Sequence, residues 1–455
     1  MSATSVRDMT KGNITRHLIG FTLPLLLGNL FQQLYNMVDC IIVGQHVGRD
    51  ALGAVGSVGS INFLCFSLCL GLGNGIGILV SQFFGAGEDE KVKQSIGQAL
   101  YVTLISGAIM SIIGGCFARQ ILTLMGSSKE NFDYALTYMT IVCGFTFINA
   151  IYNSISAILR SLGDATTPLK FLIVASVVNV ILDLLFVVKF DWGVAGAAYA
   201  TVFSQGIAAA GSIIYGIHIN PYLRLKKEHF KVRGDLIKRE VRIGLPLAAQ
   251  SSTIAISCVI LQAVVNGFGP TVTAAYASTN RLEQLVQQPY NTLGIAMSTF
   301  AGQNFGAGKK ERIMQAAKRG IAIVVGFSLL MIIVMYAFGP NLVGLFVDDK
   351  EVIDIGTAGL RFTSFCYVFL GLIYVMRGLL NGVGDVFFSM INGIIEVSGR
   401  IGFTFILIYM LGLDFHAVWY TNGLTWSLTG IISAIRFYRA KWRDKKMEVY
   451  DEQED

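Results

Sequence analysis

Two aspartates lie inside long apolar stretches of this sequence, where a charged group is costly and therefore usually has a function. Asp39 is near the end of the stretch 16–43, and Asp183 lies in the stretch 169–189. Each shares a helical face with other polar side chains, which are Asn29, Gln32, Tyr35 and Asn36 for Asp39, and Ser176 and Asn179 for Asp183. Such faces line a wet cavity or a helix contact rather than lipid.

The oxygen atoms on these faces suit a small hard cation. A third stretch, 194–218, adds the hydroxyl groups of Thr201 and Ser204 and the amide of Gln205. Carboxylate, amide and hydroxyl oxygens are the ligands that such cations prefer. Two nearby carboxyl groups in a low dielectric also retain a proton readily. These residues therefore predict a site for Na⁺ or H⁺, and the choice between the two ions stays open.

The second half of the chain has polar faces of its own. The stretch 274–301 and the stretch 386–411 carry them, with Asn280, Glu283, Gln287 and Asn291 in one and Ser389, Asn392, Glu396, Arg400 and Thr404 in the other. Glu396 and Arg400 are four residues apart, so they can pair along one helix. A structural ion pair and a contact with substrate are both open interpretations of these two residues.

The composition indicates that lipid surrounds most of the chain. Of the 455 residues, 53% are apolar and only 14% are charged, whereas a soluble protein has about 25% charged residues. The 50 glycines fit helices that pack closely within a membrane. The fold expected is an all-α integral membrane protein.

Twelve apolar stretches are long enough to cross a bilayer as helices. They are 16–43, 51–83, 95–117, 133–159, 169–189, 194–218, 243–266, 274–301, 320–346, 355–376, 386–411 and 416–438. With a cytoplasmic N-terminus, 27 of the 35 basic residues fall in inside segments or at the inner ends of spans, and five fall in outside loops or at the outer ends of spans. This bias agrees with the positive-inside rule. We therefore expect a cell-membrane protein with both termini in the cytoplasm. Its net charge of +6 is then explained by basic residues that set the topology and contact anionic lipid, and it does not indicate nucleic-acid binding.

The two halves of the sequence repeat one another. Residues 82–87 (QFFGAG) match 303–308 (QNFGAG), residues 23–25 (LPL) match 245–247, and residues 163–164 (GD) match 384–385, at spacings of 221 or 222. Six spans in each half give a parallel repeat of two six-helix bundles. The expected organisation is a first bundle 1–218, a cytoplasmic linker 219–242, a second bundle 243–440 and a cytoplasmic tail 441–455.

Several classes of function lack their signals. No GxxxxGK[ST] motif is present, so ATP is not the expected energy source. The glycines at 71, 73, 75 and 77 follow no strand and are explained better by close helix packing than by a nucleotide. The five histidines are scattered without ligand spacing and the seven cysteines form no CxxC pair, so neither an enzyme nor a resident cofactor is expected.

The chain resembles the multidrug and toxic compound extrusion (MATE) transporters over nearly its whole length, through the repeat, Pro24, Asp39, Thr201 and the pair Asn179 and Asp183. The presence of Asp183 beside Asn179 resembles the archaeal and the DinF-like or MepA-like branches more than the NorM branch. The resemblance implies export of cationic or amphipathic drugs by antiport with Na⁺ or H⁺. It also implies that the coupling ion binds Asp39, Asn179, Asp183 and Thr201. Some relatives use a carboxylate on span seven as well, where this chain has Gln250 as its most prominent polar residue.

The polar helix faces and the prolines suggest the remaining roles. The candidate hinges are Pro24 and its repeat counterpart Pro246, and a monomer that contacts drugs and lipid is expected. The candidate lining of the substrate cavity is Gln32, Tyr35, Asn36, Glu283, Gln287, Glu396 and Arg400. The alternative function is a lipid-linked oligosaccharide flippase of the same superfamily, which would carry more spans and a strongly cationic cavity.

Overall fold

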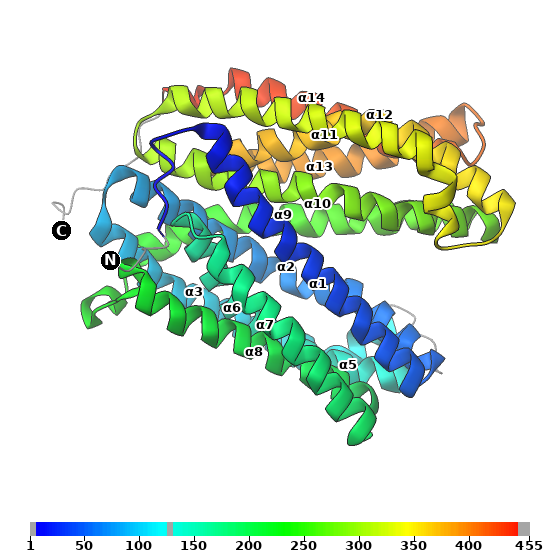
Figure 1. Ribbon diagram of the computed structural model, residues 1–455, viewed down its shortest axis with the longest axis horizontal. Coiled ribbons are helices and arrows are strands. Elements are labelled where there is room, and N and C mark those ends of the chain that lie inside the picture. The colour runs from blue at the N-terminus through cyan, green and yellow to red at the C-terminus, as the bar shows by residue number, and fades with distance from the viewer. Residues whose placement is uncertain (1–5, 125–130, 445–455) are drawn as a thin grey trace. The chain divides into compact units, whose positions relative to one another are not determined.

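The computed structural model describes residues 6–124 and 131–444, and its regular elements in these ranges are all helical (Figure 1). These residues form two compact units. The first unit contains residues 6–8 and 23–249, and the second contains residues 9–22 and 250–444, as far as the structure describes them. Two long helices, α1 and α9, therefore pass from one unit into the other.

The first unit is built on helices that are mostly long enough to cross a membrane. They are α1 (Ile14–His46), α2 (Arg49–Ala86), α3 (Asp89–Cys116), α4 (Ala118–Leu124), α5 (Phe132–Gly144), α6 (Thr146–Ser161), α7 (Thr166–Asp183), the π-helix η1 (Leu184–Lys189) and α8 (Gly193–Ile219). Helix α8 packs against both α6 and α7 (Figure 1). This packing brings α7 and α8, which carry most of the predicted ion ligands, next to each other.

The stretch 133–159, expected as one continuous span, is instead a bent pair of helices. Helices α5 and α6 meet at an angle of 46° around Phe145. Helix α5 ends at Gly144, and glycine is a common site of sharp helix bends because it has no side chain to hold the turn. The stretch therefore provides one candidate span, as expected, and the structure adds a bend that its apolar residues do not predict.

The segment between the halves is held against helix α3. It contains two short 3₁₀ turns, η2 (Pro221–Leu223) and η3 (Lys227–Phe230), and leads into α9 (Gly234–Asn266). Gln98 donates to the carbonyls of His229 and Lys231 at 3.1 and 2.9 Å, and the Tyr101 hydroxyl donates to Phe230 O at 2.6 Å. The backbone of this segment is thus satisfied by side chains of α3.

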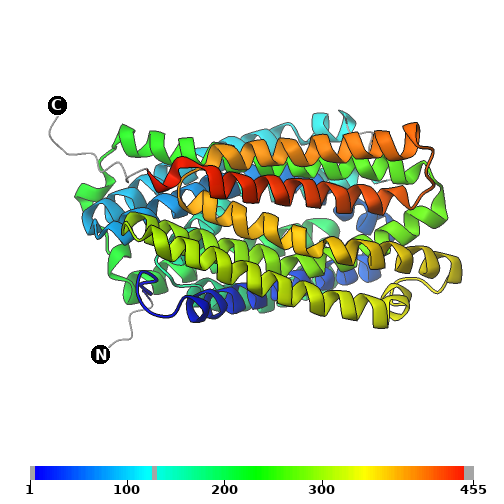
Figure 2. The same ribbon diagram turned by 90° about the horizontal axis from the view of Figure 1, so that it is seen from above.

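The second unit repeats the helical plan. Its elements are the later part of α9, α10 (Pro270–Gly306), α11 (Lys310–Gly344), α12 (Lys350–Gly382), α13 (Val386–Thr404), the π-helix η4 (Phe405–Met410) and α14 (Ala417–Arg439). Figure 2 shows α10 to α14, coloured from green to red, running alongside one another. Helix α12 packs against α10, α11 and α14 and so forms the centre of this unit.

All twelve expected spans are helical in the structure, including the bent pair. Among the described residues, nine helices are apolar and long enough to cross a membrane, and the α5–α6 pair brings the number to ten. The other two, α10 and α14, cover the expected spans 274–301 and 416–438 but fall short in hydropathy. They bury polar side chains such as Glu283 and Asn422 inside the unit, which lowers their mean hydropathy without exposing those groups to lipid.

The duplication is visible in the backbone. Residues with a left-handed backbone recur 221 positions apart, as Gly48 and Gly269, Gly87 and Gly308, Gly163 and Gly384, and Asp191 and Gly412. The π-helices η1 and η4 also lie 221 positions apart and have the same length. The two halves of the chain therefore share the positions of their helix ends and π-helices as well as those of their apolar stretches.

The glycines near residue 75 serve helix packing, as the sequence predicts. A Cβ on Gly71 would lie 2.4 Å from the backbone of Ala248, and one on Gly75 would lie 2.6 Å from Gly244, both on α9. Gly77 meets Ala157 on α6 in the same way, at 3.1 Å. Helix α2 approaches both neighbours through glycine faces, which confirms the packing interpretation of this motif.

Candidate functional site

Helices α1 and α7 bring two carboxyl groups into direct contact. Asp39 and Asp183 are 144 positions apart in the sequence, yet their side chains lie within hydrogen-bonding range of each other. Asp183 is completely buried and Asp39 is partly buried. Asp183 is the last residue of α7, at the point where the helix changes to the π-helix η1. The widened turn follows directly after the functional carboxyl.

Among the described residues, no cationic side chain pairs with either of the two carboxyl groups. Oδ1 of Asp39 and both carboxyl oxygens of Asp183 accept no hydrogen bond from a donor group in the described residues. The amide of Asn179, one turn earlier on α7, is fully buried and also makes no hydrogen bond there. Two carboxylates about 4 Å apart repel by about 4 kcal/mol at an effective dielectric constant of about 20. A proton or a cation between them removes this repulsion.

Helix α8 contributes the neighbouring polar groups. The amide of Gln205 donates to the Tyr35 hydroxyl at 3.3 Å, which links α8 to the face of α1 that carries Asp39. Thr201, one turn before Gln205, donates its hydroxyl to Ala197 O at 3.0 Å and keeps its oxygen lone pairs for another partner. Gln32 makes a side-chain hydrogen bond with Tyr35.

Two residues differ from the sequence-based expectation. Ser176 was grouped with Asn179, but its hydroxyl donates to Leu172 O at 2.8 Å, on its own helix. Tyr138 of α5 was not singled out, yet its ring interacts electrostatically with both Asp39 and Asp183. Nothing in its apolar stretch marks Tyr138, and only the packing of α5 against α8 and α1 reveals its position.

In the second unit, Glu396 and Arg400 form a buried ion pair. Arg400 Nη2 lies 3.3 Å from Glu396 Oε1, and both side chains are less than one-tenth exposed. Arg400 Nη1 also donates to the Ser257 hydroxyl and to Cys258 Sγ on α9. Glu283 of α10 is buried close by, makes a side-chain hydrogen bond with Thr363 and interacts with the charge of Arg400.

The other candidate residues lie outside this pair. Gln287 accepts a hydrogen bond from the Tyr374 hydroxyl at 3.4 Å. With its amide turned so that the oxygen faces Arg377, Gln250 accepts from Arg377 Nε and Nη1 at 3.2 and 2.7 Å. Asn36 is exposed on α1. The structure therefore groups the candidates into one carboxyl site in the first unit and one ion-pair site in the second.

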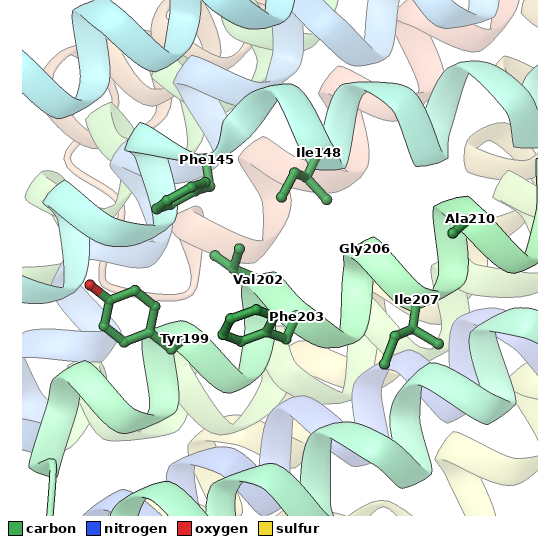
Figure 3. Close-up of a pocket in the computed structure, with 8 residues that line it drawn as sticks. All are labelled: Phe145, Ile148, Tyr199, Val202, Phe203, Gly206, Ile207 and Ala210. Atoms are coloured by element: carbon green, nitrogen blue, oxygen red, sulfur yellow. The ribbon is translucent and has the colours of Figure 1, made fainter.

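An apolar pocket of about 300 Å³ lies on the first unit, away from these charged groups. Figure 3 shows Phe145 and Ile148 on one side of the pocket and α8 on the other side. The α8 residues that line it are Tyr199, Val202, Phe203, Gly206, Ile207 and Ala210. None of these eight lining residues is charged, so the pocket does not provide an ion site.

Comparison with known proteins now identifies the family. A family model described as MatE matches residues 24–185 and 246–406, which is most of the chain. The chain belongs to the MatE family. The same model matches once in each half, at a spacing of 221 to 222 residues, which confirms the internal duplication. The resemblance inferred from Pro24, the glycine motifs and the intramembrane carboxylates is confirmed.

Relatives of this MatE chain match it from end to end. A probable multidrug resistance protein, YoeA, from Bacillus subtilis is 28% identical over 96% of both chains. The multidrug export protein MepA from Staphylococcus saprophyticus is 24% identical and covers 92% of this chain and 91% of its own. These matches support the expected MepA-like resemblance.

Solved structures of MATE transporters share the fold. A multidrug resistance MATE family transporter in an outward-facing conformation superposes with a TM-score of 0.89, at 23% identity, over 95% of this chain and 98% of its own. A MATE structure in a bent conformation gives a TM-score of 0.88 at 23% identity, over 94% and 97% of the two chains. The predicted all-α membrane fold with two six-helix bundles is thereby confirmed.

Proposed function

We propose that this MatE-family protein is a secondary active transporter that exports organic cations or amphipathic drugs in exchange for Na⁺ or H⁺. The names of its relatives, which are multidrug resistance and multidrug export proteins, support this class of substrate. The single observation that carries the coupling is the buried contact between Asp39 and Asp183, which has no protein counter-charge among the described residues.

The coupling ion binds at this contact. A proton placed on one carboxyl lets the two groups share a hydrogen bond, and Na⁺ lets both stay ionised. The Asn179 carbonyl oxygen and the Thr201 hydroxyl oxygen complete an all-oxygen set for Na⁺. Either ion neutralises a charge that the low-dielectric interior tolerates poorly, so its arrival and departure change how α1 packs against α7.

Two prolines lie where the bundles connect. Helix α1 passes from the second unit to the first between Thr22 and Leu23, and Pro24 lies two residues later. Helix α9 passes between the units after Ala249, and Pro246 lies three residues earlier. Proline removes a backbone hydrogen bond from the helix interior, so bending costs less there. Both prolines are proposed to act as hinges for alternating access.

Drug and ion do not need shared ligands. Coupling requires only that ion binding favours one conformation and drug binding favours the other. When the ion enters the first unit and α1 bends at Pro24, the conformation that holds drug loses stability. The drug then leaves, and loss of the ion on the other side of the membrane resets the cycle.

The proposal is tested in proteoliposomes with an imposed Na⁺ gradient and an imposed pH gradient, applied separately. Ethidium serves as the organic cation. We expect one of the two gradients to drive ethidium accumulation against its own gradient, with collapse when an ionophore removes that ion gradient. Ethidium movement that responds to neither gradient, or translocation of lipid-linked oligosaccharide instead, would overturn the proposal.

A further inference from the structure

The repeat assigns a counterpart in the second unit to each ligand of the ion site. Gly163 matches Gly384, and η1 matches η4, both at a spacing of 221 residues. Because both ends of the segment keep this spacing, the residues between them align without a gap. Asp183 then corresponds to Thr404, and Asn179 corresponds to Arg400. A cationic side chain thus occupies, in the second unit, the helical position that an ion ligand has in the first.

The carboxyl pair itself has no counterpart. Asp39 lies between Pro24, which matches Pro246 at a spacing of 222, and Gly48, which matches Gly269 at 221. Its counterpart is therefore Ile260 or Leu261, and both are apolar. The second unit has neither aspartate at the matching positions, and it carries a fixed positive charge at the position that matches Asn179.

Arg400 is held by the helices that correspond to those of the ion site. Its guanidinium donates to Ser257 and Cys258 on α9, the counterpart of α1, and position 257 matches Tyr35 or Asn36 on the polar face of α1. Its counter-charge, Glu396, lies one turn earlier on α13, the counterpart of α7. The side chain is 5% exposed, so its charge is enclosed within the unit.

We propose that Arg400 is a tethered cation that fills a latent monovalent-cation site in the second unit. Glu396 and the Ser257 hydroxyl are the ligands of this site, and the guanidinium group replaces an exchangeable ion. The second bundle therefore binds no coupling ion, and exchange is confined to the first. This inference uses the proposed function only where it takes the Asp39–Asp183 contact as the ion site.

The test removes the tethered cation and supplies a free one. In Arg400→Ala, the purified protein in detergent should show a lower Tm than wild type, because Glu396 is left buried without its counter-charge. Millimolar guanidinium should restore the Tm in a saturable manner, because a ligand that binds only the folded state stabilises it. Urea, which has a similar shape but no charge, should restore nothing at the same concentration.

Matched variants separate this site from general effects. Arg361→Ala removes another arginine of the second unit, whose guanidinium lies over the Tyr336 ring, and it should gain nothing from guanidinium. Arg400→Ala with Glu396→Gln should lose the response, because the counter-charge is gone. If Arg400→Ala does not fold, the same Tm measurement is made on Arg400→Gln, which keeps a polar side chain. The proposal is overturned if guanidinium raises the Tm of Arg361→Ala as much as that of Arg400→Ala. It is also overturned if guanidinium raises the Tm of neither Arg400→Ala nor Arg400→Gln.

The measurement is independent of transport. Repeating it in an Asp39→Asn background should leave the guanidinium response of Arg400→Ala unchanged, even if the first-unit site proves to bind no ion. Binding of ²²Na⁺ gives a second readout. The variant Arg400→Asn places at position 400 the residue type that Asn179 has at the matching position of the first unit. It should bind one more ion per chain than wild type. A latent site is excluded if Arg400→Asn binds no more ²²Na⁺ than wild type and guanidinium does not stabilise Arg400→Ala.

Discussion

At the scale of single residues, the two units treat buried charge in opposite ways. The first unit places Asp39 against Asp183 and leaves Oδ1 of Asp39 and both carboxyl oxygens of Asp183 without a donor group from the described residues. The second unit compensates Glu396 internally, with Arg400 at 3.3 Å. An uncompensated buried pair favours uptake of an external ion, whereas an internal ion pair favours a fixed structure. We therefore propose that the same fold supports an ion-exchanging site in the first unit and a static ion pair in the second.

The first prediction concerns Asp39→Asn. This change keeps the shape of the side chain and removes its charge, so no ion is needed to neutralise the site. Gradient-driven export in proteoliposomes should fall to background, while binding of the drug to the detergent-purified protein persists. Asp133→Asn, at an exposed position on α5, is the matched control and should transport normally. Export at the normal rate by folded Asp39→Asn would contradict the mechanism.

A second prediction uses Asp183→Asn to distinguish the ions. If Na⁺ is the coupling ion, the loss of one carboxylate oxygen removes a charged ligand, and transport should be lost as severely as in Asp39→Asn. If a proton on Asp39 is sufficient, Asp183→Asn should keep measurable transport. Initial rates under separate Na⁺ and pH gradients decide between these outcomes, and a rate equal to wild type under both gradients would remove Asp183 from the site.

The third prediction concerns Glu396→Gln. Because this change leaves Arg400 buried without its partner, it should destabilise the protein by roughly 3 kcal/mol, the usual size for breaking one side of a buried pair. The measurement is the unfolding temperature in detergent, with the drug profile measured in parallel. A changed drug profile at unchanged stability would instead favour substrate contact for Glu396.

At the scale of elements, helix contacts depend on glycines that leave no room for a side chain. The fourth prediction is that Gly75→Ala forces α2 and α9 apart, because the new Cβ would lie 2.6 Å from the Gly244 backbone. The expected cost is about 1–3 kcal/mol, typical of overpacking. Gly59→Ala, on the same helix but with nothing within 4 Å, is the control and should unfold at or above the wild-type temperature. Equal melting of both variants would contradict this packing role.

At the scale of the whole molecule, the orientation in the membrane remains a prediction from charge. Single cysteines at positions 350 and 227, in a cysteine-free background, test it with an impermeant thiol reagent on intact cells. Both positions are exposed in the structure. Lys350→Cys should react from outside and Lys227→Cys should not. Lys129→Cys should also react, although position 129 lies outside the described residues. External labelling at position 227 would reverse the topology.

The sequence alone was sufficient for the spans, the duplication and the charged residues of interest. Hydropathy and repeats are local properties, because lipid requires about 20 apolar residues in a row and a copied segment keeps its spacing. Asp39, Asp183, Glu396 and Arg400 are conspicuous for the same reason, since a charge is rare in such a stretch.

Only the tertiary structure decided which of these residues meet. Asp39 and Asp183 are 144 positions apart, and no spacing rule says that α1 and α7 place them in contact. The position of Tyr138, the bend at Phe145 and the inward bond of Ser176 likewise depend on packing or backbone geometry. Arg400 could be recognised as a pairing residue from its distance to Glu396 along the helix. Its enclosure by Ser257 and Cys258 appears only when α9 packs against α13, because helix contacts depend on three-dimensional packing.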